Sequence, residues 1–308
     1  MVTIASISVW ARALRLPFLT ATAVPVISGA SIAFFEVSRF DWGLFLLSLI
    51  GAVFLHLGTN LANDYFDHKS GNDESNSSPT PFSGGSRVIQ EGLIPPKTIL
   101  FASLFCFAFG IFIGIVLYLM TNLFQILYLG AIGVLIGYFY TATPFKLGYR
   151  GFGEILTAIG FGPLMVGGSY LVQAGSFSTL AWLASIPIAI LVGLILLINE
   201  FPDHDADNKV HKKTLVVLLG TKKAMRIFHL FLAIAFAFTI AMGVIGIFPL
   251  YSLLCLLTFP LAIKAYNVSK SHHENVKELL LANQSTIMLH LGFGLLMSLG
   301  FVLAGFFG

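Results

Sequence analysis

The stretch Asn60-Leu-Ala-Asn63-Asp64-Tyr-Phe-Asp67 ends one long apolar run, and Asn199-Glu200-Phe-Pro-Asp203-His-Asp205-Ala-Asp207 ends another. Carboxylates at membrane depth cost free energy, so they are rarely kept there without a function. The whole chain holds only 14 acidic residues. Two matching clusters among so few acids predict a site that binds a divalent cation and a polyanion.

The composition identifies an integral membrane protein. Hydrophobic residues make up 57% of the 308 residues and charged residues 10%, whereas a soluble domain carries about 25% charged residues. Apolar runs separated by polar, Gly or Pro residues predict a single all-α membrane domain over residues 1–308. The nine expected spans are 17–36, 42–66, 97–119, 122–142, 152–173, 178–201, 223–246, 248–269 and 285–307.

The distribution of Lys and Arg predicts the orientation in the membrane. With the N-terminus in the cytoplasm, every Lys and Arg except Arg39 falls in a cytoplasmic segment, as the positive-inside rule requires. We therefore expect a multi-pass protein of the cell membrane with a cytoplasmic N-terminus and an outer C-terminus. Both acidic clusters then face the cytoplasm, four helices apart, which suggests a repeat of four-helix units.

Two cytoplasmic loops are long enough to take part in a site. Residues 71–86 have the composition of a disordered linker, and we expect them to form a mobile flap over the acidic clusters. Residues 208–223 are basic and contain a short apolar stretch, which is typical of a segment at the membrane interface.

Each acidic cluster predicts a stripe of oxygen ligands along one helix. Spacings of i, i+3, i+4 and i+7 put the first set on one helical face: Asn60, Asn63, Asp64 and Asp67. Spacings of i, i+4 and i+8 do the same for the second set: Asn199, Asp203 and Asp207. We expect Pro202 to loosen the second helix near its end, and Glu200 and Asp205 to point elsewhere.

The two stripes supply hard oxygen ligands of the kind that Mg²⁺ prefers. Magnesium usually takes one or two carboxylates together with substrate phosphates. The pattern thus predicts a phosphorylated ligand that metal bridges to both helices. The alternative is that these side chains cap helix ends or form solvated turns.

Basic residues on the same side would bind the remaining phosphate oxygens. The candidates are Arg15, Arg87, Lys146 and Arg150; anchoring to lipid headgroups is the alternative for each. Arg87 and Lys146 are favoured because each lies beside irregular, Gly- or Pro-marked backbone. Tyr140 would face a bound ring or a developing cation, although tyrosine is also common at membrane interfaces. The 30 Phe residues would supply rings to line a cavity for an apolar tail and stabilise a carbocation.

The first motif resembles that of the UbiA superfamily of intramembrane aromatic prenyltransferases, and the resemblance covers nearly the whole chain. Asn63 and Asp67 match the first two positions of the superfamily's NxxxDxxxD motif. The third position falls on Gly71, and the next acid is Asp73. This longer spacing is similar to the menaquinone branch, whose members prenylate 1,4-dihydroxy-2-naphthoate.

The second motif of the superfamily, DxxxD, is matched by Asp203 and Asp207. Further stretches are similar to the same branch: 83–89, 140–154 and 213–220. The resemblance implies nine helices around a central cavity, with Mg²⁺ as the cofactor. It also implies that an isoprenyl diphosphate ionises to an allylic cation, which an aromatic acceptor captures, with decarboxylation when the acceptor is the naphthoate.

The resemblance assigns roles to individual residues. The catalytic set is Asn63, Asp67, Tyr140, Asp203 and Asp207. The metal-binding set is Asn63, Asp64, Asp67, Asp73, Asp203 and Asp207. The diphosphate-binding set is Arg15, Asn60, Arg87, Lys146 and Asn199. The expected partners are the two substrates and the lipid bilayer, with no nucleic acid and no protein partner evident.

Several alternatives stay open at this point. Relatives with the same fold would use 4-hydroxybenzoate, homogentisate, haem or a glycerol phosphate as the acceptor. A cation-coupled transporter also uses intramembrane carboxylates, although both clusters here are expected at one membrane face and not at the midplane. A CDP-alcohol phosphotransferase would carry a DGxxAR sequence, which this chain lacks.

Overall fold

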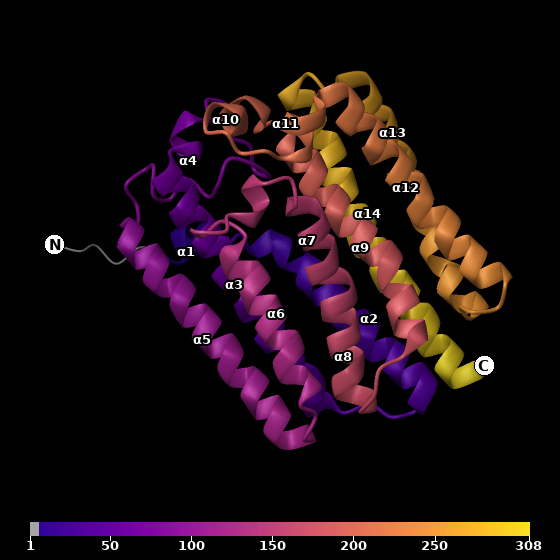
Figure 1. Ribbon diagram of the computed structural model, residues 1–308. Helices are drawn as coiled ribbons and strands as arrows, with labels where there is room; N and C mark the ends of the chain where they lie inside the picture. Colours follow the sequence, from indigo (N-terminus) through magenta and orange to yellow (C-terminus); the bar gives the residue numbers. More distant parts are fainter. Residues whose placement is uncertain (1–5) are drawn as a thin grey trace.

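The computed structural model describes residues 6–308 as a bundle of long helices (Figure 1). Eight helical segments are long and apolar enough to cross a membrane, and α6 (Gln125–Phe139) adds a shorter apolar helix of 15 residues. The nine expected spans thus correspond to eight long segments and one short one, and the chain is a multi-pass membrane protein.

The first half of the chain supplies the elements from α1 to α8. They are α1 (Ile7–Ala13), η1 (Leu16–Leu19), α2 (Thr20–Val37), α3 (Trp42–Ser70), α4 (Asn72–Ser75), α5 (Pro96–Thr121), α6, η2 (Leu147–Tyr149), α7 (Gly153–Ile159), η3 (Gly160–Leu164) and α8 (Met165–Ala174). The predicted fifth span is therefore interrupted. A π-helical turn that contains Pro163 separates α7 from α8, because proline cannot donate the regular backbone hydrogen bond.

The second half supplies the remaining helices. They are α9 (Thr179–Glu200), α10 (His204–Lys209), α11 (Leu215–Leu219), α12 (Thr221–Val244), η4 (Leu250–Thr258), α13 (Phe259–His272) and α14 (Val276–Phe307). The last helix begins nine residues before the predicted start at residue 285, because Asn275 caps it by accepting from the backbone N–H groups of Lys277 and Glu278. The eighth span begins as a 3₁₀ helix, η4.

The principal apolar core lies where α2, α9, α12, α13 and α14 meet. Its largest fully buried rings are Phe228, Phe248, Phe293 and Phe301. Smaller clusters join α3 to α5 and α6. The bundle is therefore closely packed on one side, and α3, α5, α6 and α8 leave room for a cavity on the other.

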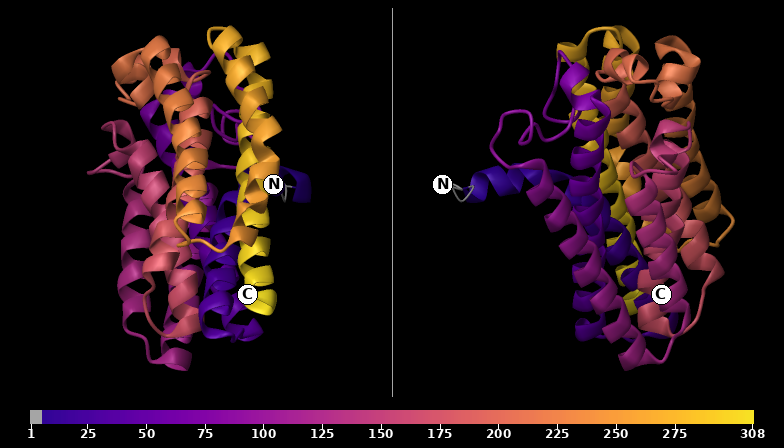
Figure 2. Two further views of the ribbon diagram at one scale, coloured as in Figure 1. Left: turned by 90° about the vertical axis from the view of Figure 1, so that its right-hand side faces the viewer. Right: turned by 60° about the vertical axis from the view of Figure 1, so that its left-hand side comes forward.

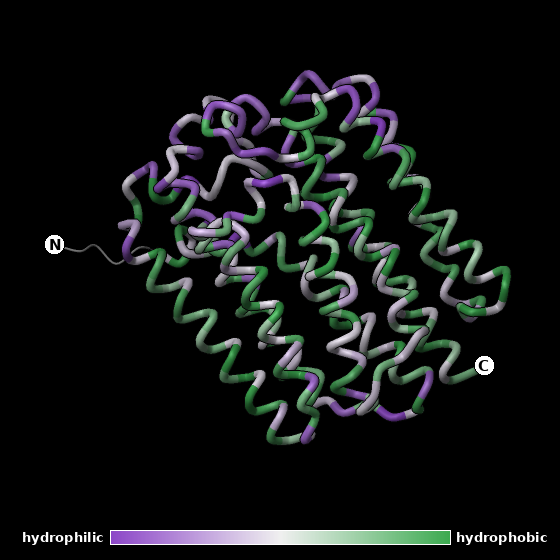
Figure 3. The backbone as a smooth tube through the Cα atoms, viewed as in Figure 1, coloured by the Kyte–Doolittle hydropathy of each residue, from purple (hydrophilic) through white to green (hydrophobic). Residues whose placement is uncertain are grey.

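The polar residues gather at one end of the bundle, where α4, α10 and α11 lie (Figures 1 and 3). The two acidic clusters meet at this end, where the side chain of Asn72, the first residue of α4, donates to Asp207 Oδ1 of α10 over 3.0 Å. The C-terminus lies toward the opposite end, and α1 projects sideways from the bundle (Figure 2). The clusters thus share one face, as the sequence predicts.

Gly29 marks the closest approach of α2 to α8. A Cβ atom at this position would lie 2.2 Å from the Val166 carbonyl oxygen and 2.8 Å from Ser169 Cβ. Small residues that let helix backbones meet are a common means of association in membranes.

We expect Gly29→Ala to lower the Tm in detergent by about 5 °C or more, because the added methyl group pushes α2 away from α8. Gly130→Ala is the matched control, since nothing lies within 4 Å of the Cβ that it adds. Equal Tm values for the two variants would show that this helix contact does not limit stability.

Candidate active site

A polar cavity of about 1160 Å³ opens where the two acidic clusters meet. Its walls come from α3, the segment 72–85, α9 and the start of α10. Its polar lining consists of Arg15, His56, Thr59, Asn60, Asn63, Asp67, Asn72, Asp73, Asn76, Ser83, Tyr140, Thr157, Asn199, Glu200, Asp203, Asp207 and Lys212. Nine of the predicted site residues are among them.

The stripe predicted on α3 holds for three of its four members. Asn60, Asn63 and Asp67 line the cavity, because α3 stays helical to Ser70 and keeps them on one face. Asp64 does not line the cavity. Its Oδ1 accepts from the Arg15 guanidinium and from the Ser86 backbone N–H at 3.2 Å.

The second stripe is not one continuous helix, and that prediction is wrong. α9 ends at Glu200 and α10 begins at His204, with Pro202 in the turn between them. Asp203 and Asp207 nevertheless reach the cavity. Glu200 was expected to point elsewhere but lines the cavity too, whereas the Asp205 side chain is 92% exposed.

Residues 71–86, which we call the strap, are folded onto the site instead of forming the disordered flap predicted. The Asn76 side chain donates to Asp203 Oδ1 over 2.8 Å, and the Gly84 backbone N–H donates to Asp203 Oδ2 over 3.0 Å. Asn72, Asp73 and Asn76 are buried. The strap thus ties the second acidic motif to the end of α3.

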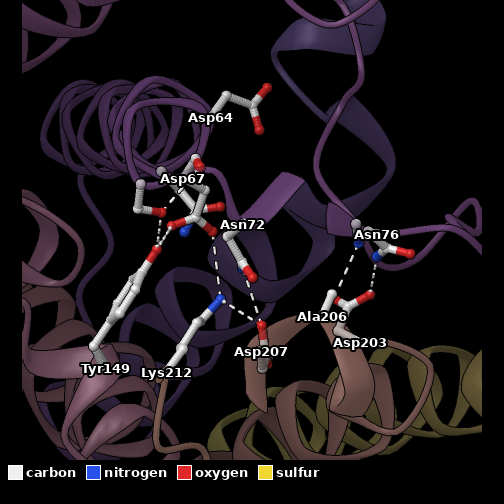
Figure 4. A network of polar contacts seen from close by, with 12 residues as sticks. Asp64, Asp67, Asn72, Asn76, Tyr149, Asp203, Ala206, Asp207 and Lys212 are labelled. Carbon is white, nitrogen blue, oxygen red and sulfur yellow. Dashed lines mark hydrogen bonds and ion pairs between the residues drawn. The ribbon is translucent and has the colours of Figure 1, made fainter. Parts of the chain in front are cut away.

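Lys212 lies between the two acidic motifs (Figure 4). Its ammonium nitrogen is 3.3 Å from Asp67 Oδ2 and 3.4 Å from Asp207 Oδ1. The Tyr149 hydroxyl donates to the other oxygen of Asp67 over 2.7 Å. Burial lowers the pKa of Lys212, but the charges of Asp207 and Asp67 outweigh this effect and raise the pKa well above its usual value. The lysine therefore stays charged.

Sequence reasoning missed Lys212 because the basic loop 208–223 was assigned to the membrane interface. Its place five residues after Asp207 was the available signal. The fold also adds Asn72, Asn76 and Glu200 to the site.

The acids around the cavity repel one another. Burial, with the nearby charges of Asp67 and Asp64, raises the pKa of Asp73 to about 8. Burial and the charge of Asp207 raise the pKa of Asp203 to about 6. Lys212 and Arg15 thus only partly balance the carboxylates, which makes the cavity favourable for a further cation.

The donor set fits Mg²⁺ shared with a ligand. Within residues 6–308, no three His, Cys, Asp or Glu side chains converge closely enough to form a closed metal site. The acids instead flank the cavity, and Asn72 Oδ1 has no hydrogen-bond partner among the described residues. Magnesium that takes few protein carboxylates and completes its shell with water and phosphate needs this open arrangement.

Arg87 and Lys146 are not brought to the cavity wall, contrary to their predicted role in diphosphate binding. The Arg87 guanidinium donates to the Asp73 backbone carbonyl and so supports the strap. The Lys146 ammonium lies 5.1 Å from the centre of the Tyr149 ring. Arg15 and Lys212 are the basic residues that line the cavity.

A second, mostly apolar cavity of about 1200 Å³ continues from the polar one between α3, α5, α6 and α8. Five residues line both cavities and define the neck between them: His56, Thr59, Tyr140, Thr157 and Phe161. Gly148 and Gly153 pack against Tyr140, since a Cβ on either would lie 2.8 Å from the side chain. The phenol is therefore fixed at the neck.

Sequence comparisons find proteins related to this chain. The sequence profile described as the UbiA prenyltransferase family matches residues 22–290. The 1,4-dihydroxy-2-naphthoate octaprenyltransferase of Bacillus subtilis (strain 168) is 32% identical, with 94% of this chain and 90% of that protein covered. The chloroplastic 2-carboxy-1,4-naphthoquinone phytyltransferase of Arabidopsis thaliana is 28% identical, with 96% of this chain and 77% of that protein covered.

The fold is also similar to that of a solved structure. A UbiA homolog from Archaeoglobus fulgidus, bound to GPP and Mg²⁺, superimposes with a TM-score of 0.69 at 14% identity. The superposition covers 94% of this chain and 99% of the other. At this identity the likeness shows a shared fold.

Gly85 tests whether the strap must be seated on the site. Its φ is +74°, and a Cβ would lie 2.4 Å from Asp73 Oδ2. We expect Gly85→Ala to speed hydrogen exchange and proteolysis across residues 72–86, because it adds a clash to a left-handed strain of about 1 kcal/mol.

Gly92→Ala is the matched control, because φ there is +68° and the added Cβ meets nothing within 4 Å. Unchanged exchange of the strap in Gly85→Ala would contradict its close packing against Asp73.

Proposed function

The chain belongs to the UbiA prenyltransferase family, and from this premise we propose that it transfers a polyprenyl group from an isoprenyl diphosphate to 1,4-dihydroxy-2-naphthoate, with loss of CO₂. The naphthoate is the acceptor in the name of the Bacillus subtilis relative, which is similar along nearly the whole chain. Menaquinone biosynthesis is the process that this reaction serves.

The observation that carries the proposal is the pairing of two joined cavities of opposite character. One is lined by acids, amides, Arg15 and Lys212, and the other is lined mainly by apolar residues. A prenyl diphosphate has the same division, with a polyanionic head and a hydrocarbon tail. Placed across the neck, its allylic carbon lies close to Tyr140.

The diphosphate head of the donor has partners in this placement. Arg15 and Lys212 bind diphosphate oxygens, and Asn60, Asn63 and Asn199 donate from their amides. Asp67, Asp73, Asp203 and Asp207 would hold Mg²⁺, which supplies neutralisation of the charge on the departing diphosphate.

The neck then protects the cation and directs its capture. The aromatic faces of Tyr140 and Phe161 stabilise an allylic cation, and the apolar cavity keeps water away from it. The acceptor ring attacks through the carbon that carries its carboxylate. The new carbon–carbon bond forms, the bond to the carboxylate breaks, and its electron pair returns to the ring as CO₂ leaves.

The orientation follows from the same distribution of Lys and Arg as before. We infer that the acidic end faces the cytoplasm, with the N-terminus inside and the C-terminus outside. This places the site where soluble diphosphate leaves into the cytoplasm.

The direct test is the mass of the product. Purified protein in detergent, given 1,4-dihydroxy-2-naphthoate, geranylgeranyl diphosphate and Mg²⁺, should yield a decarboxylated prenyl naphthoquinol, and EDTA should stop its formation because the diphosphate head loses its counter-charge. Parallel reactions with 4-hydroxybenzoate, homogentisate and a glycerol phosphate are the controls for acceptor choice. Product from one of these and none from the naphthoate would refute the proposed acceptor.

A further inference from the structure

The polar cavity holds, close to Tyr140 of the neck, a buried acid that diphosphate binding does not explain. Glu200, the last residue of α9, lines the polar cavity and is only 6% exposed. Its Oε2 has no hydrogen-bond partner among the described residues. A buried carboxyl without a partner is costly, so the place is suited to a ligand that donates a hydrogen bond.

The surroundings hold Glu200 in position. The preceding residue, Asn199, accepts from the Asn283 amide of α14 over 2.7 Å. Glu154 of α7 lies beside Glu200 and is fixed by the Leu215 backbone N–H, which donates to its Oε1 over 2.8 Å. The residue before Glu200 and the acid beside it are thus both fixed, which limits the positions open to the Glu200 side chain.

The two substrates bring three kinds of group to the site: a diphosphate, a hydrocarbon tail and a ring hydroxyl. The ring hydroxyl fits Glu200 best. A diphosphate oxygen accepts hydrogen bonds, and the head of the donor already has Arg15, Lys212 and the amides of the two motifs as partners. A prenyl tail offers no donor. The phenolic hydroxyl of a hydroxylated ring does donate, and such a ring must reach the neck to meet the allylic carbon.

We propose that Glu200 forms an acceptor subsite beside the neck, where its carboxyl group accepts a hydrogen bond from a ring hydroxyl of the acceptor while Tyr140 and Phe161 pack against the ring. The subsite rests on the proposed function for the identity of the acceptor. It predicts that a hydroxylated ring is recognised through its hydroxyl, independently of the diphosphate.

The test compares Glu200→Gln with wild type in two assays. In turnover, we expect KM for the dihydroxynaphthoate to rise roughly 10- to 100-fold, the usual effect of leaving a buried hydrogen-bond donor unpaired, with KM for geranylgeranyl diphosphate unchanged. The analogue 1-hydroxy-2-naphthoate, which lacks one hydroxyl, should probe the same contact: a wild-type preference for the dihydroxy compound should shrink in the variant.

In binding, the dihydroxynaphthoate should raise the wild-type Tm in EDTA and raise it less in Glu200→Gln.

Glu91→Gln is the matched control, because the same change there affects an exposed pair with Arg12. If Glu200→Gln does not fold, Glu200→Asp keeps the carboxyl group, withdraws it by one methylene, and should give a smaller rise in the acceptor KM.

The outcomes separate the subsite from the proposed function. Wild type that gains Tm with the acceptor, more than Glu200→Gln does, but forms no product supports the subsite and contradicts the naphthoate reaction. Equal acceptor KM values and equal Tm shifts in wild type and Glu200→Gln overturn the subsite, as does a wild-type Tm that the acceptor leaves unchanged.

Discussion

Two distant helix ends bring carboxylates to one place, and the structure depends on balancing the repulsion between them. Asp67 from α3 and Asp207 from α10 are held together because the Lys212 ammonium lies between them at 3.3 and 3.4 Å. Arg15 forms an ion pair with Asp64. These two cations leave Asp73 and Asp203 only partly balanced, so the polar end of an apolar bundle is kept ready for a cation and its anionic ligand.

The second constraint is the change of character along the cavity. The tightly packed half of the bundle, around α9, α12 and α14, gives α9 a fixed wall from which Asn199 and Glu200 project. The other half encloses the apolar cavity between α3, α5, α6 and α8. The polar and apolar cavities therefore follow one another along one path, and in the proposed reaction the two substrates would meet at the neck beside Tyr140.

The sequence predicts those parts that depend on local pattern. The apolar runs give the spans, and the α3 stripe is confirmed at Asn60, Asn63 and Asp67 because helical periodicity continues to Ser70. The α9 stripe fails because the helix ends at Glu200 and Pro202 lies in the turn that follows. Lys212, the folded strap and Glu200 depend on contacts between distant segments, such as the 145 positions between Asp67 and Lys212. Periodicity carries no information on such contacts. Arg87 and Lys146 were favoured for the diphosphate because irregular backbone lies beside them, and that local feature does not say which segments they contact either.

We propose that both acidic motifs act on one diphosphate, and a double-mutant cycle measures this coupling directly. Binding of geranylgeranyl diphosphate with Mg²⁺ would be compared for Asp67→Asn, Asp203→Asn and the double variant, with the exposed Asp205→Asn replacing Asp203→Asn in a control cycle. One shared ligand predicts that the two effects are non-additive by at least about 0.5 kcal/mol, whereas the control cycle is additive. Additive losses in both cycles would mean that the two motifs do not act on one shared diphosphate.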